Sequence, residues 1–310
     1  MAIKLLNLHA ATLLSCGEEK INEGEKGLLV YTTSFVHPSC FVGFCIGQNH
    51  PRQVGFLYKW SWRQLEQCIS QGSNCDKCAY AGDEIWVAAG TYVEMITLKK
   101  DVALYGGFSG VETQRDQRNW IENKTILDGN HCVSVVTASN LGTTTACIDG
   151  FTIRNGKADY GGGIYCYYSS PTILNNTITG NSAEDGGGGI YCICSSPSIS
   201  NNIIAFNSSG IYSYRYYYCS GSPILRNNCV YNPGGYNYSG TNPGIGDIQV
   251  DPKLCAVECG NVHIKPDSPC VNAGDNSVVQ PDWVDMDGQP RIQGAGVDIG
   301  ADESDGTTCG

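Results

Sequence analysis

Acidic residues recur in this chain at a spacing that could place their carboxylates side by side. Asp159 and Asp185 lie 26 residues apart, and Glu184 precedes the second of them. Carboxylate oxygens bind Ca²⁺, and Lys157 or Arg215 could supply the base that abstracts a proton from a sugar. These five residues form the candidate catalytic set. Both Asp residues also precede Gly runs, where Asp often stabilises a solvated turn, so a structural role is the alternative.

Half of the eighteen tyrosines fall between residues 165 and 218. Strand alternation would turn them to the outside of a sheet, where flat rings with polar tips can stack on sugars or on another protein. Tyr also has a high β-strand propensity, so the same residues could simply stabilise the sheet. The residues predicted for carbohydrate or partner binding are Tyr165, Tyr167, Tyr191, Tyr212 and Tyr214.

Seventeen cysteines indicate export, because thiols of a cytosolic protein are kept reduced. Cys166 and Cys192 should lie on neighbouring strands, either as a disulfide or as a column of buried thiols. Two further groups are candidates, namely Cys132 with Cys147, and Cys255 and Cys259 with Cys270.

A second set of carboxylates lies near the end of the sequence. Asp285 and Asp287 alternate ahead of a Gly as calcium ligands do, and Asp298 could join them in the fold. The third ligand and the distant Glu of an EF-hand are missing, and a turn stabilised by Asx hydrogen bonds would account for the same residues. Calcium is therefore a candidate ion, although no cofactor is required.

The elements that position these residues follow a repeat. Pro171, Pro197 and Pro223 are 26 residues apart, and an Asn pair follows each of them at the same interval. Gly-Ile-Tyr recurs beside them without helical spacing of apolar residues, so the segments are predicted to be strands. Ile164, which should point inward, recurs as Ile190 and Ile211.

Such units bury their apolar sides only against their neighbours, which predicts a solenoid of three-stranded coils. About seven coils fit between residues 82 and 250. The Asn pairs suit tight corners, because Asn tolerates the left-handed region. The charged segment 111–123, with Arg115 and Arg118, is expected to form a solvated loop.

The repeat resembles the right-handed parallel β-helix of the pectate-lyase-like superfamily. Three motifs, Gly-Asp-Glu-Ile-Trp-Val-Ala-Ala-Gly-Thr-Tyr at 82–92, Val-Ala-Leu-Tyr-Gly-Gly-Phe at 102–108 and Val-Asp-Ile-Gly-Ala-Asp-Glu at 297–303, are similar to bacterial secreted or surface members. The resemblance implies an all-β fold, a helix over the open N-terminal end of the solenoid and an irregular C-terminal cap. Its members are mostly uncharacterised, so it implies the fold more than an activity.

The first residues have the layout of a bacterial lipoprotein signal, with Leu13 and Ser15 ahead of a lipidated Cys16; an ordinary N-terminal segment is the alternative. No stretch reaches the roughly 20 apolar residues of a transmembrane helix. The expected segments are a signal (1–16), an unassigned region (17–60), an N-terminal cap (61–81), the β-helix (82–250) and a C-terminal cap (251–310).

The net charge of −11, without a basic cluster, argues against nucleic acid as a ligand. We expect an extracellular or cell-surface module that binds a polysaccharide or a surface protein without catalysis. The alternative is a calcium-dependent polysaccharide lyase or another carbohydrate-active enzyme, such as a glycoside hydrolase. Few charges in residues 150–232 favour binding.

Overall fold

The computed structural model divides the chain into Met1–Ser39 and Cys40–Gly310, and all described residues belong to the second unit. The predicted signal with Cys16, nearly all of the predicted N-terminal cap, and Asp285, Asp287 and Cys259 lie outside these residues. The structure describes residues 41–46, 59–60, 79–112, 114–118, 123–219, 221–256, 261–279, 292, 295–302, 304 and 306.

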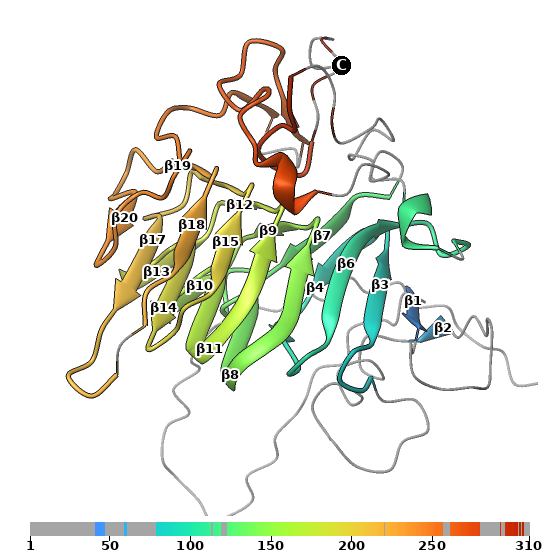
Figure 1. Cartoon of the computed structure of the whole chain (residues 1–310), viewed down its shortest axis with the longest axis horizontal. Coiled ribbons are helices and arrows are strands. Elements are labelled where there is room, and N and C mark those ends of the chain that lie inside the picture. Colours follow the sequence, from blue (N-terminus) through green and yellow to red (C-terminus); the bar gives the residue numbers. More distant parts are fainter. Residues whose placement is uncertain are drawn as a thin grey trace, which may run out of the picture. The chain divides into compact units, whose positions relative to one another are not determined.

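Residues 84–250 wind into coils with three faces, each built from parallel strands (Figure 1). The first face comprises β3 (Glu84–Ala88), β6 (Ala103–Phe108), the ends of β8 (Val136–Asp149) and β11 (Ile164–Leu174), β15 (Ser198–Ser200) and β18 (Ile224–Arg226). The second comprises β4 (Gly90–Val93), β7 (Thr125–Asp128), β9 (Thr152–Arg154), β12 (Thr177–Thr179), β16 (Ile203–Ala205) and β19 (Cys229–Tyr231). The third comprises β5 (Ile96–Thr97), the starts of β8 and β11, β14 (Ile190–Ile193), β17 (Ile211–Tyr214) and β20 (Tyr238–Ser239).

The register confirms the predicted stacking of the repeats. Ile164 pairs with Ile190, which pairs with Ile211, and all three are fully buried. Together with the equivalent residues of the other two faces they form one continuous apolar core. The Gly pairs before these strands lie where coils touch, since a Cβ on Gly163 would approach Gly189 O to 2.5 Å. The sequence therefore stacks identical residues along the axis.

The two residues of each Asn pair have different structural roles. The first Asn takes the left-handed conformation, with φ of 51° at Asn175 and 54° at Asn201, as predicted. The second is buried and hydrogen-bonds from coil to coil: Asn176 Nδ2 donates to Asn202 Oδ1 at 3.1 Å, and Asn202 Nδ2 to Asn228 Oδ1 at 3.1 Å. A second such ladder, at the next corner, comprises Asn181, Asn207 and Asn232. The sequence interpretation missed both ladders.

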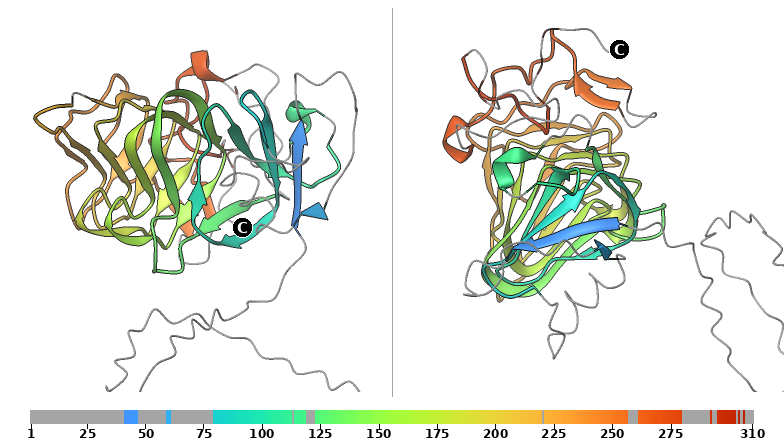
Figure 2. Two further views of the ribbon diagram at one scale, coloured as in Figure 1. Left: turned by 90° about the horizontal axis from the view of Figure 1, so that it is seen from below. Right: turned by 90° about the vertical axis from the view of Figure 1, so that its right-hand side faces the viewer.

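An antiparallel strand pairs with the first coil. β1 (Phe41–Ile46) pairs with β3 from Gly43 to Ile46, and its other edge pairs with β2 (Lys59–Trp60) (Figure 2). An unpaired edge would otherwise offer hydrogen-bonding groups to other chains. β1 lies in the region that the sequence left unassigned.

The C-terminal segment packs along the side of several coils, whereas the sequence predicted a cap. Leu174 contacts Val279 and Val297, and Asn201 accepts a hydrogen bond from the backbone of Asp275 at 2.8 Å. This placement is visible in Figures 1 and 2. Ile245, on the last coil, remains 80% exposed. The segment also includes the antiparallel pair β21 (Leu254–Ala256) and β22 (Asn261–Ile264) and the 3₁₀ turn η3 (Asn276–Val278).

The prediction of a solvated loop at 111–123 is wrong for Arg118. The loop, with the 3₁₀ turn η1 (Arg115–Gln117), folds back over the outer surface of the first face. Arg118 is 1% exposed and pairs with the buried Asp149 at 3.3 Å, and its guanidinium lies 5.5 Å from the Tyr105 ring. The aromatic surface formed by Tyr105 and its neighbours holds the arginine in place.

Candidate functional site

The outward tyrosines form a column across the third face. In-register pairing of β11, β14 and β17 aligns Tyr165, Tyr191 and Tyr212, with ring centroids 5.8 and 5.2 Å apart and planes within 13° and 1° of parallel. The rings point outward, as predicted. Their faces cover one another, however, so Tyr191 is only 5% exposed. The middle of the column cannot offer a ring face to a sugar.

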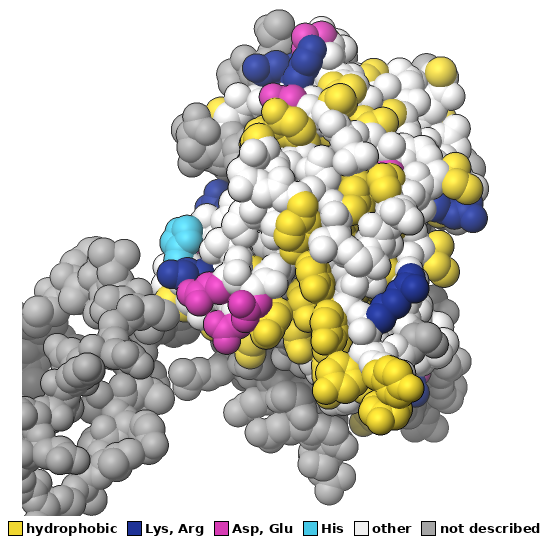
Figure 3. Space-filling model, turned by 90° about the vertical axis from the view of Figure 1, so that its left-hand side faces the viewer, with side chains coloured by type: hydrophobic (Ala, Val, Ile, Leu, Met, Phe, Trp, Pro, Cys, Tyr) yellow, Lys and Arg dark blue, Asp and Glu magenta, His cyan; other side chains and the backbone are white. Residues whose placement is uncertain are grey.

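Open rings are found where the column reaches the last coils. Tyr214 lies beside Tyr212, with ring centroids 6.4 Å apart, and is 37% exposed. The loop that follows carries Tyr216, Tyr217 and Tyr218, which are 56%, 91% and 87% exposed. Figure 3 shows the hydrophobic side chains gathered as a band across this end of the molecule. The ring faces available for stacking therefore belong to residues 214–218, which we call the tyrosine loop.

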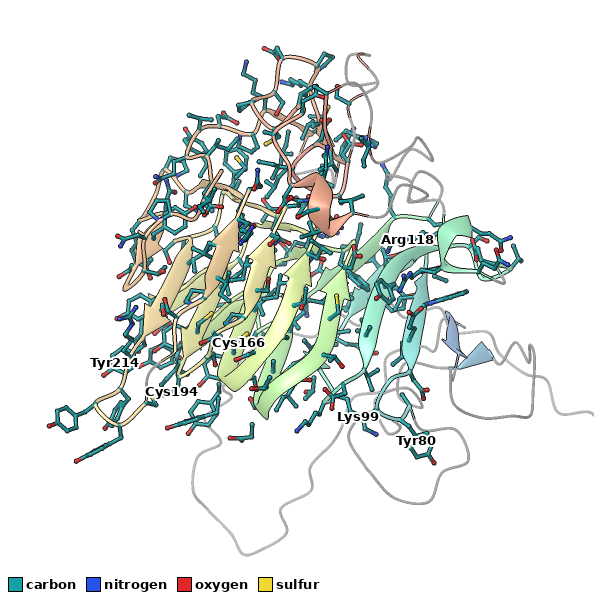
Figure 4. The ribbon with its side chains drawn as sticks, viewed as in Figure 1. Tyr80, Lys99, Arg118, Cys166, Cys194 and Tyr214 are labelled. Carbon is teal, nitrogen blue, oxygen red and sulfur yellow. A yellow bond between two sulfur atoms is a disulfide. The ribbon has the colours of Figure 1, made fainter. Side chains whose placement is uncertain are left out.

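A disulfide between Cys194 and Cys219 anchors the tyrosine loop to the preceding coil. The two Cα atoms are 5.4 Å apart, and Figure 4 places Cys194 close to Tyr214. The sequence interpretation missed this pair. Its signal was the spacing of 25 residues, which nearly equals the repeat and so places both cysteines at matching positions on neighbouring coils.

A groove of about 760 Å³ lies beside the tyrosine loop. It lies where the third face, the first face and the turn 240–244 meet, and its lining includes Tyr212, Tyr214, Arg215 and Asn242. Arg215 is the only charged residue of the lining, and within the described part of the chain its side chain forms no ion pair or hydrogen bond. Aromatic rings, amide and hydroxyl groups and one free cation thus surround a space large enough for a small ligand.

The candidate catalytic acids lie at a different corner. The short parallel strands β10 (Lys157–Tyr160) and β13 (Ser182–Gly186) place Asp159 alongside Glu184 and Asp185, as the 26-residue spacing predicted. All three carboxylates and Lys157 are exposed. None of these residues lines the groove.

Arg215 does not join these acids. It follows the end of β17, whereas Asp185 precedes the start of the neighbouring strand β14. Four residues of strand, about 13 Å, lie between the two positions. The structure therefore brings together the acids of the candidate set but not Arg215, because opposite ends of the third face carry them.

Of the predicted calcium ligands, only Asp298 lies within the described residues. It is 3% exposed, and its carboxylate accepts hydrogen bonds from the backbone of Asn272 at 2.5 Å and of Ser304 at 2.7 Å. These bonds tie together segments that are 26 and 6 residues away in the sequence, so Asp298 has a structural role in the C-terminal segment, which is neither the predicted calcium site nor a local Asx turn. In the part of the chain that the structure describes, no group of three or more His, Cys, Asp or Glu residues could hold a metal ion.

The stacked coils, in-register faces and Asn corners all point to one architecture. The family model for the right-handed β-helix region matches residues 69–250. The chain belongs to the right-handed β-helix family. No curated protein and no solved structure matches it. In the portion of this β-helix placed by the structure, no helix has the length and apolar character to cross a bilayer.

The remaining cysteines of the β-helix correct several predicted pairings. Cys132 is disulfide-bonded but Cys147 is a free thiol, so their pairing is wrong; Cys132 precedes the 14-residue strand β8, and Cys147 lies near its far end. Cys255 is also disulfide-bonded while Cys270 is free, so these two are not joined either. Cys166 and Cys192 are paired in register and both free, which is the buried thiol column of the two alternatives.

Buried tyrosines make the stability of the β-helix sensitive to alkaline pH. Burial raises the pKa of Tyr92, Tyr105 and Tyr191 above 10, because a phenolate would lose its hydration. Above pH 10 the unfolded chain therefore loses protons that the folded chain keeps, and the stability present below pH 10 declines as pH rises. We expect these three tyrosines to lower the free energy of unfolding by about 1 kcal/mol from pH 8 to pH 10 and further beyond. The buried thiols of Cys147 and Cys192, whose pKa is also raised, add to the fall over the same pH range.

Guanidinium titrations at pH 8, 10 and 11, with absorbance of phenolate as a second readout, measure this effect. A free energy of unfolding that stays constant up to pH 11 would contradict it.

Proposed function

We propose that this β-helix is an exported glycan-binding module, and that its ligand binds without turnover in the groove beside the tyrosine loop. The single observation that carries the proposal is a loop of open tyrosine rings, held by a disulfide, next to a groove of about 760 Å³ whose lining includes Tyr212 and Tyr214. Aromatic faces next to amide and hydroxyl groups suit a sugar, which has apolar ring faces and polar edges.

Rigidity supports the same proposal. The tyrosine loop is tied to the previous coil by Cys194–Cys219, and the ring of Tyr214 lies beside the nearly parallel ring of Tyr212. A ligand therefore meets rings that are already positioned, and less ordering entropy is lost on binding. Because the chain carries a net charge of −11, we propose a neutral glycan in preference to a polyanion.

Disulfide bonds favour an exported location, since reduced compartments rarely sustain them. We propose the bacterial cell surface, with lipidation at Cys16 as the mode of attachment. Neighbouring surface proteins are the other class of partner that exposed tyrosines would suit.

The enzymatic alternative is favoured by one observation, the alignment of Asp159 with Glu184 and Asp185 on β10 and β13. In this alternative the protein is a calcium-dependent lyase whose acids and Lys157 lie on exposed strands. Incubation with uronate polymers, with and without Ca²⁺, separates the two functions. Unsaturated chain ends that appear only with the wild-type chain, and not with Asp185→Asn, would replace the binding proposal.

The binding proposal predicts the effect of removing the two most exposed rings. A glycan array identifies a ligand, and calorimetry measures its affinity for the wild type and for the Tyr217→Ala, Tyr218→Ala double variant. We expect affinity to fall about tenfold or more, because roughly 1.4 kcal/mol of stacking is lost.

Tyr80→Ala is the matched control, since Tyr80 is 61% exposed but precedes β3, on the first coil. The control should bind like the wild type. Equal affinities of all three proteins would contradict a contact between the ligand and the tyrosine loop, and retention of no glycan on the array would contradict glycan binding altogether.

A further inference from the structure

Two buried thiols meet where the C-terminal segment contacts the last coils. Cys229 begins β19, Cys270 lies in a turn of the C-terminal segment, and both side chains are 0% exposed. The thiol of Cys270 interacts with that of Cys229 and raises its pKa, while Cys229 Sγ also donates to Val250 O at 3.3 Å. They share one apolar cluster with Ile203, Ala205, Leu254, Ile264 and Ile299. The contact therefore joins the solenoid to the segment along its side.

A second pair of thiols, Cys166 and Cys192, provides an internal comparison. These two are also buried and interact with each other, but they are register partners on β11 and β14. Parallel strands hold such partners about 4.8 Å apart with parallel side chains, whereas a disulfide needs Cβ atoms about 3.8 Å apart. The ladder thus keeps this pair as thiols.

No strand ladder fixes the distance between Cys229 and Cys270. Cys229 pairs with Ile203 on one side and with Ile248 on the other. Cys270 is held only by turn hydrogen bonds and by one backbone bond from Ile299. Small shifts of the C-terminal segment can therefore bring the two sulfur atoms to bonding distance. We propose that Cys229 and Cys270 form a disulfide that locks the C-terminal segment onto the β-helix.

The bond forms by thiol–disulfide exchange with a small-molecule or protein disulfide. The thiolate of one cysteine attacks the oxidant and releases one thiol. The second thiolate then attacks the mixed disulfide and releases the other, so two protons and two electrons pass from the cysteines to the oxidant. Interaction with the Cys270 thiol and burial raise the pKa of Cys229, so thiolate is scarce once the segment has docked. The exchange therefore takes place before or during docking.

Peptide mapping tests the proposal. The full chain is refolded in a glutathione redox buffer until the Cys194–Cys219 peptides are cross-linked, then denatured and alkylated without reduction. Trypsin together with a protease that cleaves before Asp yields 227–246, with Cys229 alone, and 267–274, with Cys270 alone. We expect these two peptides to be cross-linked and Cys166 and Cys192 to carry the alkyl group. Alkylated Cys229 and Cys270 beside an intact Cys194–Cys219 bond would overturn the proposal.

Thermal unfolding gives a second readout. The bond would join residues 41 positions apart in the sequence, and its removal by Cys270→Ser should lower the Tm of the oxidised protein by roughly 5–10 °C. The double variant with Cys229→Ser should show the same loss, because one bond is removed in both. Cys166→Ser is the control for placing a hydroxyl at a buried thiol. A Cys270→Ser loss equal in oxidised and reduced protein would also overturn the proposal.

Discussion

Arg118→Ala should reduce the free energy of unfolding by about 3–5 kcal/mol. Arg118 and Asp149 are 1% and 0% exposed in their side chains, so removal of the cation leaves a carboxylate in a site that water does not reach. The amide of Asn175, which donates to Asp149 Oδ1 at 3.2 Å, is neutral and does not compensate this charge. The cost of burying an uncompensated charge exceeds the worth of the ion pair itself. Guanidinium titration measures the change.

Arg115→Ala is the matched control for this prediction. Arg115 lies three residues earlier in the same loop, forms its ion pair with Glu84 at 2.6 Å, and is 31% exposed in its side chain. Water can replace its contacts, so we expect a loss of about 1 kcal/mol or less. In addition, Arg118→Met combined with Asp149→Leu should cost less than Arg118→Ala alone. Equal effects of Arg118→Ala and Arg115→Ala would show that the buried pair does not stabilise the loop.

Asn202→Ala should cost a similar amount, about 3–5 kcal/mol, because it interrupts the buried ladder in its middle. Asn202 Oδ1 accepts hydrogen bonds from the backbone N–H and the side-chain amide of Asn176, at 2.9 and 3.1 Å. Its Nδ2 donates to Ile173 O and Ser200 O at 2.9 Å each. Alanine removes a partner from each of these buried groups, although Asn176 Nδ2 keeps Ile148 O and Ser200 O keeps the backbone N–H of Asn175. Each buried group left unpaired costs about 1–3 kcal/mol.

An exposed ladder of the same period supplies the control. Ser196 Oγ accepts a hydrogen bond from the backbone of Ser222 at 3.2 Å, again across one coil, but at the surface. Ser196→Ala should therefore change stability by less than about 0.5 kcal/mol, since water replaces the lost bond. If chemical denaturation shows equal losses of free energy of unfolding for Asn202→Ala and Ser196→Ala, the buried amides stabilise the fold much less than their hydrogen bonds indicate.

The candidate site was partly predictable from the sequence. Alternation in Gly-Ile-Tyr-Cys correctly predicts that Tyr165 points outward, and the repeat correctly aligns it with Tyr191 and Tyr212. Alternation cannot show that stacked rings cover each other, because that depends on ring orientation on neighbouring coils. The exposed rings of Tyr217 and Tyr218 lie outside the regular repeat, in an insertion whose path is set by the Cys194–Cys219 bond.

The sequence by itself determined the coiled architecture, the inward isoleucines and the corners at the Asn pairs. The sequence was sufficient because each residue of a coil contacts mainly the equivalent residue one repeat away. The spacing of the repeat therefore also predicts the tertiary contacts. Only the tertiary structure decided the burial of Arg118, the groove at the last coils and the position of the C-terminal segment along the side. Those features arise from irregular segments that pack against distant coils. Their contacts depend on shape complementarity and desolvation, which no sequence repeat predicts.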